Sequence, residues 1–139
     1  MDYKTVTPEF AVAPQIQPND IETIKNLGYV AIINNRPDDE TPDQPATGSL
    51  AKIASEAGLQ YYDIPIRSGT LSAEAIDETR STINSINGPV FAFCRSGTRS
   101  ITLWALAQIG QKDGQEILSA VASAGYDLPF LAQFITPEQ

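Results

Sequence analysis

The chain has 139 residues, of which 42% are hydrophobic, and this size predicts one compact domain over residues 1–139. Its formal net charge is −8, so its surface repels nucleic acid and anionic lipid, and neither is expected as a partner. It contains no histidine, which excludes Cys-His and Ser-His-Asp catalysis and removes the commonest zinc ligand.

Hydrophobic periodicity and turn residues predict strands that alternate with helices along the chain. Proline cannot donate to a sheet ladder, so Pro14 marks the first strand as an edge strand, and Pro65 marks the third as an edge strand or its end. Strands are expected at the apolar runs 10–13, 29–33, 61–66 and 89–93. Helices are expected at 18–27, 49–57, 72–86, 100–109 and 114–124, with a short one at 129–135.

The expected helices carry apolar faces that can pack against a sheet. The helix over 100–109 is apolar nearly all round, so we expect it to be buried. Alternation of this kind predicts an α/β fold in three layers, with a mostly parallel central sheet of four to five strands flanked by helices. The apolar stripes of the first three helices are Ile21, Ile24 and Leu27, then Leu50, Ile53 and Ala57, then Ile76, Thr79, Ile83 and Ile86.

Three polar segments should meet at one edge of this sheet. In parallel sheets the ligand site lies beyond the carboxyl ends of the strands. Cys94 directly follows the last expected strand, and the segments 34–36 and 67–69 follow two others. Residues 34–47 form a long polar loop with three prolines, and such loops are often functional.

The chain's only cysteine begins a short loop that is suited to holding an anion. The amides of residues 95–100 can curl round the sulfur, and the start of the following helix adds partial positive charge. Gly97 supplies a position that is free to adopt a positive φ. The four residues that separate Cys94 from Arg99 are Arg95, Ser96, Gly97 and Thr98.

Two side chains at the end of this loop favour a thiolate at Cys94. Arg99 can reach back as a planar fork of donors, and Ser100 can give its hydroxyl to the sulfur. Arg95 is either part of the anion site or a solvated residue on its rim. The alternative for Cys94 is an inert buried side chain, which the surrounding motif disfavours.

The loop resembles those of two families of cysteine enzymes. Many rhodanese sulfurtransferases read CRSGxRS, and residues 94–100 read CRSGTRS. Dual-specificity phosphatases use His-Cys, five residues, and then Arg-Ser or Arg-Thr. This chain has Phe93 in place of that histidine and one residue fewer before Arg99.

Over residues 3–127 the chain resembles the phosphatase-like domain family of beta-lactamase hydrolase-like proteins. The resemblance implies a cysteine-phosphatase-like fold of the small dual-specificity type. Members are often named phosphatases, and some occur fused to or beside persulfide dioxygenases and sulfide-oxidising enzymes, which implies sulfur metabolism and a partner of that kind. The motifs that carry it are VTP at 6–8, INNRPD at 33–38, YDIP at 62–65 and AGYD at 124–127.

Two departures from the phosphatase pattern favour sulfur chemistry. The shorter loop encloses a smaller cavity, and the stretch 64–66 is not followed by the Asp that would protonate a leaving group. Asp38, Asp39 or Glu40 could supply that acid, or they form a solvated acidic loop. Sulfur transfer needs no such acid, because thiolates leave readily.

These observations predict a sulfurtransferase that forms a persulfide on Cys94 from a small anionic or sulfane-sulfur substrate, such as a persulfide or thiosulfate. An external acceptor, which is a thiol such as glutathione, sulfite or cyanide, would then take the sulfur. Arg67 and Arg36 either line the mouth of the site or form surface salt bridges. The alternative is a phosphatase that acts through a phosphocysteine on Cys94, and the third reading is a non-catalytic anion-binding module.

We assign no metal or cofactor, and we expect a cytoplasmic protein. A single cysteine suits a reducing compartment. The first residues lack the basic start and apolar core of a signal peptide. No apolar run approaches the roughly 20 residues that span a bilayer.

Overall fold

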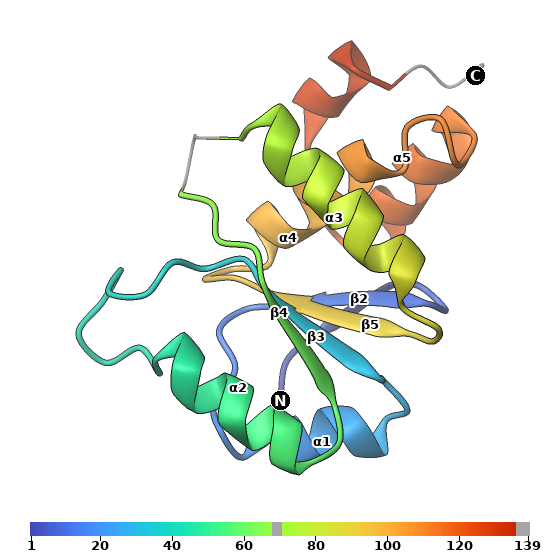
Figure 1. Ribbon diagram of the computed structural model, residues 1–139. Coiled ribbons are helices and arrows are strands. Elements are labelled where there is room, and N and C mark those ends of the chain that lie inside the picture. Colours follow the sequence, from blue (N-terminus) through green and yellow to red (C-terminus); the bar gives the residue numbers. More distant parts are fainter. Residues whose placement is uncertain (68–70, 136–139) are drawn as a thin grey trace.

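The computed structural model describes residues 1–67 and 71–135, and it contains one five-stranded sheet (Figure 1). The strands are β1 (Lys4–Thr7), β2 (Phe10–Ala13), β3 (Ala31–Asn34), β4 (Gln60–Asp63) and β5 (Val90–Phe93), in the order β1-β2-β5-β3-β4. Only the β1–β2 pair is antiparallel. The mostly parallel α/β sheet expected from the sequence is therefore confirmed.

Helices cover both faces of the sheet (Figure 1). They are α1 (Asp20–Asn26), α2 (Thr47–Glu56), α3 (Ala73–Ser85), α4 (Thr98–Ala107), α5 (Gly114–Ser123) and the short 3-10 helix η1 (Pro129–Gln133). α1 and α2 lie on one face, and α3, α4 and α5 lie on the other. The three-layer arrangement predicted from the sequence is confirmed.

The core forms two apolar clusters, one on each face of the sheet. Successive side chains of a strand point to opposite faces, so neighbours in sequence separate into different clusters. Phe91 and Phe93 pack with α1 and α2, whereas Val90 and Ala92 pack with α4 and α5. Burial of β5 on both faces explains its unbroken apolar sequence.

Four sequence expectations need correction. The strand at 10–13 is not an edge strand, because the polar strand β1 pairs with it and leaves all four β2 residues buried. β1 itself was not expected, since only Val6 among its residues is buried. Leu27 is 46% exposed because α1 ends at Asn26. α4 begins at Thr98, two residues earlier than expected.

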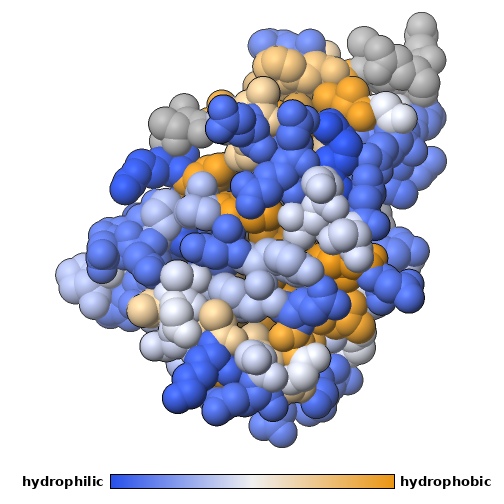
Figure 2. All heavy atoms as spheres, in the orientation of Figure 1, coloured by the Kyte–Doolittle hydropathy of each residue, from blue (hydrophilic) through white to orange (hydrophobic). Residues whose placement is uncertain are grey.

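The surface is mostly hydrophilic on the face drawn in Figure 2, which agrees with the formal charge of −8. Within residues 1–67 and 71–135, no helix has the length and apolar character needed to cross a membrane. Residues 68–70, in the loop expected after the third strand, lie outside the described part of the chain.

Asn35 ties together the carboxyl ends of three strands. Its backbone N–H donates to the carbonyl of Phe93 at 2.9 Å, and its own carbonyl accepts from the amide of Ile66 at 3.0 Å. Its side-chain Nδ2 donates to the carbonyl of Ile64 at 2.9 Å, and this bond is buried. The end of β3 therefore fixes the last residue of β5 and the segment that follows β4.

We expect Asn35→Ala to lower the free energy of unfolding by about 1–3 kcal/mol, because the buried Ile64 carbonyl would lose its partner. Urea unfolding monitored by circular dichroism measures this change. Asn26→Ala, at an exposed position at the end of α1, is the control and should change stability by less than about 1 kcal/mol. Equal effects of the two substitutions would contradict the role given to Asn35.

Candidate active site

Cys94 lies at the carboxyl end of the central strand β5, with its sulfur against the start of α4. The residue is fully buried, and its Sγ accepts a hydrogen bond from the amide of Gly97 at 3.0 Å. Gly97 is the N-cap residue of α4, so the partial positive charge of the helix start also faces this region. The loop therefore brings an amide and a helix terminus to the sulfur.

Gly97 is required at this position by both conformation and space. Its φ is +92°, a backbone angle that residues other than glycine rarely adopt. A Cβ there would overlap the hydroxyl of Tyr126 and approach the backbone of Ala13. The sequence predicts the positive φ, but it does not predict that Tyr126 packs against the loop.

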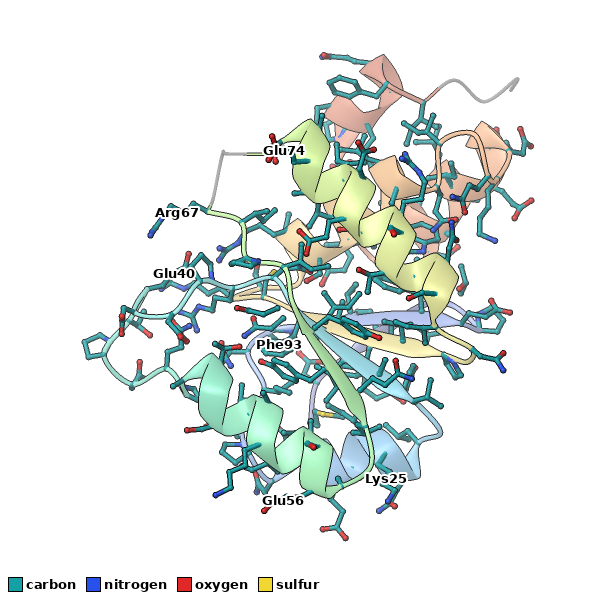
Figure 3. The ribbon with its side chains drawn as sticks, viewed as in Figure 1. Lys25, Glu40, Glu56, Arg67, Glu74 and Phe93 are labelled. Carbon is teal, nitrogen blue, oxygen red and sulfur yellow. The ribbon has the colours of Figure 1, made fainter. Side chains whose placement is uncertain are left out.

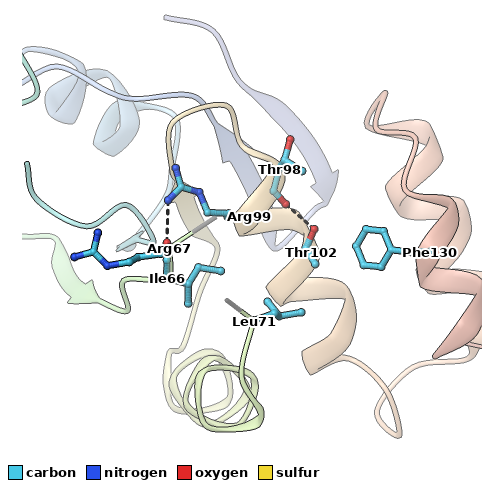
Figure 4. Close-up of a pocket in the computed structure, with 7 residues that line it drawn as sticks. All are labelled: Ile66, Arg67, Leu71, Thr98, Arg99, Thr102 and Phe130. Atoms are coloured by element: carbon cyan, nitrogen blue, oxygen red, sulfur yellow. Dashed lines mark hydrogen bonds between the residues drawn. The ribbon is translucent and has the colours of Figure 1, made fainter. Parts of the chain in front are cut away.

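Arg99 is held beside the loop by three hydrogen bonds. Its Nη1 and Nη2 donate to the two carboxylate oxygens of Glu40 at 2.8 and 2.9 Å. Nη1 also donates to the carbonyl of Ile66 at 2.8 Å, the bond that Figure 4 shows. The hydrogen bond to Glu40, and then the attraction of Cys94, raise the pKa of Arg99. The guanidinium is thus charged, oriented and electrostatically coupled to Cys94.

The fork of Arg99 keeps one edge for a ligand. A guanidinium has five N–H donors, and Glu40 and Ile66 take three of them. This leaves Nε–H and one N–H of Nη2, which lie side by side, and a hydrogen bond with the Cys94 side chain is among the interactions that raise the pKa of Arg99. Such an edge matches the two oxygens of a tetrahedral anion.

Glu40 lies between two guanidinium groups. Besides Arg99, its carboxylate accepts from Nε of Arg36 at 2.9 Å. The hydrogen bond from Arg99 has the largest effect, and with that from Arg36 it lowers the pKa of Glu40 to about 2. Glu40 is therefore ionised near neutral pH and has no proton to give to a leaving group.

The other acids of the 34–47 loop are placed differently. Asp38 accepts a hydrogen bond from the backbone N–H of Thr47 at 2.8 Å, at the start of α2. Asp39 is exposed and adopts a φ of +66°, in a turn. In the described part of the chain, no hydrogen bond joins either carboxylate to the cysteine loop. Neither Asp38 nor Asp39 is therefore placed as the general acid.

Ser100 does not form the hydrogen bond to Cys94 that the sequence predicts. The side chain is buried, and its Oγ has no hydrogen-bond partner among the described residues. The reason is that α4 begins at Thr98, so Ser100 lies in its first turn and not in the loop around the sulfur. A buried hydroxyl without a partner is uncommon, because it costs free energy.

The predicted arginines take separate places around the loop. Arg36 is 4% exposed, so it forms a buried salt bridge and not a surface one, and its Nη1 donates to Gln15 at 2.9 Å. Arg67 lies at the same end of the sheet as Glu40, whereas Lys25 and Glu56 lie away from it (Figure 3). Arg95 and Ser96 are exposed, and the Oγ of Ser96 donates to Thr98 at 3.2 Å.

Three cavities flank the loop, and the third, of about 450 Å³, includes Arg95, Ser96 and Tyr126 in its lining. The first, of about 280 Å³, is mainly apolar with Arg99 in its wall, and the second, of about 330 Å³, is polar. The first is lined by Ile66, Arg67, Leu71, Thr98, Arg99, Thr102 and Phe130 (Figure 4). The second is lined by Gln15, Gln17, Arg36, Thr41, Asp43, Gln44, Pro45 and Arg95.

Two contributors to the site, Gln15 and Tyr126, were missed from the sequence, and a third, Glu40, was considered only as an acid and not as the partner of Arg99. Gln15 follows β2, Glu40 reaches Arg99 from 59 positions away, and Tyr126 follows α5. Two signals were present. Arg36 and Glu40 are four residues apart, as ion pairs within one segment often are, and Tyr126 belongs to the AGYD motif at 124–127. Neither signal indicates which distant residue is contacted.

Comparison with known proteins gives one family and similar structures. Residues 2–111 match the family described as beta-lactamase hydrolase-like protein, phosphatase-like domain. A beta-lactamase hydrolase-like protein of Agrobacterium fabrum is 31% identical over 125 residues, which cover 88% of this chain and 29% of that protein. The chain therefore spans less than a third of the length of that relative.

Solved structures share the fold. A crystal structure of a candidate phosphatase from Neisseria meningitidis aligns with a TM-score of 0.81 and 28% identity, over 94% of each chain. Tk-PTP in its active form aligns with a TM-score of 0.74 and 16% identity, over 95% of this chain and 90% of that one. The fold is that of the cysteine-phosphatase-like α/β proteins.

We expect Gly97→Ala to lower the free energy of unfolding by about 1–3 kcal/mol, because it combines a strained φ with overlap at Tyr126. Thermal unfolding measures the loss. Gly48→Ala is the matched control, since Gly48 lies in α2 with open space around it, and the change should be neutral or stabilising. A Gly97→Ala protein as stable as the wild type would refute this account.

We expect Glu40→Gln to lower the free energy of unfolding at pH 7 by about 2 kcal/mol. The free energy of unfolding of the variant should also fall less steeply with decreasing pH than that of the wild type. The folded-state pKa of Glu40, about 2, lies below its ordinary value of 4.5. Its contribution is therefore present above about pH 4.5 and is lost as the pH falls towards 2. Urea unfolding between pH 3 and pH 7 measures it, and parallel profiles for the variant and the wild type would contradict this role.

Proposed function

Because the chain belongs to the phosphatase-like domain family of beta-lactamase hydrolase-like proteins, we propose that it is a cysteine-dependent phosphatase whose nucleophile is Cys94. The observation that carries this proposal is the sulfur at the end of β5, which receives the Gly97 amide beside the oriented guanidinium of Arg99. The comparisons support this function better than the sulfurtransferase that the loop length led us to predict, since the matching family and the similar structures are phosphatase-like.

In the first step the Cys94 thiolate attacks the phosphorus of a phosphate monoester. The S–P bond forms as the bond from phosphorus to the leaving oxygen breaks. Negative charge on the phosphoryl oxygens is stabilised by the loop amides and by the remaining Nε–H and Nη2–H edge of Arg99. Water then attacks the phosphocysteine, which releases phosphate and restores the thiol group.

Glu40 acts on this reaction through Arg99. Together with the Ile66 carbonyl, it fixes the guanidinium so that little reorganisation is needed when charge develops on the phosphoryl group. Because it is ionised, it does not protonate the leaving oxygen. The enzyme should therefore favour substrates whose leaving groups are stable as anions, such as electron-poor aryl phosphates.

A second candidate function, sulfur transfer, is favoured by one specific observation. The site combines a four-residue spacing from Cys94 to Arg99 with an ionised Glu40, and neither Asp38 nor Asp39 forms a hydrogen bond with the cysteine loop in the described part of the chain. In this reaction the thiolate attacks the outer sulfur of a persulfide or thiosulfate, a new S–S bond forms, and a thiolate or sulfite leaves. An external thiol, sulfite or cyanide then takes the sulfur, and a persulfide dioxygenase would be a suitable partner.

A paired assay tests the proposal. We expect the wild-type protein to hydrolyse para-nitrophenyl phosphate faster than phenyl phosphate, because nitrophenolate leaves without a proton. We expect Cys94→Ser to lose about a thousandfold or more of this activity. Rapid quenching and mass spectrometry should find the mass of a phosphoryl group on Cys94.

The second half of the assay supplies thiosulfate with cyanide, or glutathione persulfide. Addition of one sulfur atom to Cys94, without hydrolysis of either aryl phosphate, would replace the phosphatase with the sulfurtransferase. If neither adduct forms and Cys94→Ser still binds sulfate by calorimetry, the chain is an anion-binding module and both enzymatic proposals are wrong.

A further inference from the structure

Tyr126 and Cys94 are joined by a single peptide group. The hydroxyl of Tyr126 donates to the carbonyl of Ser96 at 3.2 Å. The N–H of the same peptide group, which belongs to Gly97, donates to Sγ of Cys94 at 3.0 Å. A chain of two hydrogen bonds therefore runs from the phenol through the Ser96–Gly97 peptide to the sulfur.

The geometry of a peptide group makes this connection directional. In a trans peptide the carbonyl and the N–H point in opposite directions, so fixing one end fixes the other. The peptide precedes a glycine, whose missing Cβ lowers the barrier to rotating the group about its neighbouring bonds. A flipped peptide would turn a carbonyl towards the sulfur and withdraw the amide. The phenol opposes that flip, because it requires the carbonyl to stay on its side.

The end of α5 holds Tyr126 in place. Its backbone N–H donates to the carbonyl of Val121 at 3.3 Å, and Gly125 turns the chain with a φ of +91°. Its ring packs against the cluster that contains the buried residues of α4 and α5. The phenol thus reaches the loop from a separate and well-anchored element.

The phenol remains a donor throughout the neutral pH range. Burial, followed by the charge of Cys94, raises the pKa of Tyr126 above its ordinary value of 10. The titratable groups around the pair are Arg99 on α4, itself bound to Glu40, and four side chains that share a cavity with Tyr126. Those four are Asp2, Tyr3, Lys4 and Arg95.

We propose that Tyr126 is a positioning residue, whose hydroxyl orients the Ser96–Gly97 peptide so that the Gly97 amide stabilises the Cys94 thiolate. This role rests on the proposed function only in that Cys94 is the nucleophile, and it holds for phosphoryl and sulfur transfer alike. The hydroxyl does not touch the substrate, because it acts on the carbonyl side of the peptide.

Alkylation of Cys94 by iodoacetamide tests this role without any substrate. We expect Tyr126→Phe to lower the alkylation rate at pH 6 by about three- to tenfold, and to move the midpoint of the pH–rate profile upwards. Tyr62→Phe is the control, because the Tyr62 hydroxyl donates to Gln60 on β4 and has no contact with the loop. A Tyr126→Phe profile that superimposes on the wild-type profile, or an equal shift in Tyr62→Phe, would overturn the proposal.

A second measurement keeps the test valid if Tyr126→Phe does not fold. In Cys94→Ser the charge next to the phenol is removed, so we expect Tyr126 to titrate at a lower pH than in the wild type, as followed by carbon NMR of the tyrosine rings. An unchanged titration would also overturn the proposal. Failure of the aryl phosphate assay would leave both measurements intact, since neither depends on turnover.

Discussion

The carboxylate of Glu40 links the long loop after β3 to the first turn of α4, because it binds Arg36 and Arg99 at once. Without it, two guanidinium groups would face each other in a poorly solvated region, and Arg99 would lose its fixed orientation. The same arrangement has a chemical consequence. A carboxylate held between two cations cannot also hold a proton, so the site gains an oriented anion binder and forgoes an acid.

The hydrophobic pattern within individual segments explains why much of the fold could be predicted from the sequence. β5 and residues 100–107 of α4 are buried, so their apolar sequences identify them, and the position of Cys94 between them follows directly. β1 has no such pattern, since it is a polar strand that covers β2. Contacts between distant segments, such as Glu40 with Arg99, depend on loop paths, and spacing along the chain carries little information about those.

The two candidate reactions share a nucleophile and differ in their leaving group. Both use the sulfur, the Gly97 amide and the free edge of Arg99. A phosphate ester asks the enzyme to release an oxygen anion, whereas a persulfide releases a thiolate, which is already stable near neutral pH. The family relationship favours phosphate, whereas an ionised Glu40 cannot protonate the leaving oxygen of a phosphate ester.

The match to the family ends at residue 111, but the folded unit does not. α5 follows that point and buries Ile117 and Val121 in the same cluster as Trp104 of α4, and the segment after α5 delivers Tyr126 to the loop. A boundary drawn at residue 111 would therefore cut through the core, and would keep the cysteine motif while discarding the segment that supports it. The similarity to the Agrobacterium fabrum relative extends over 88% of this chain, so the supporting segment belongs with the motif.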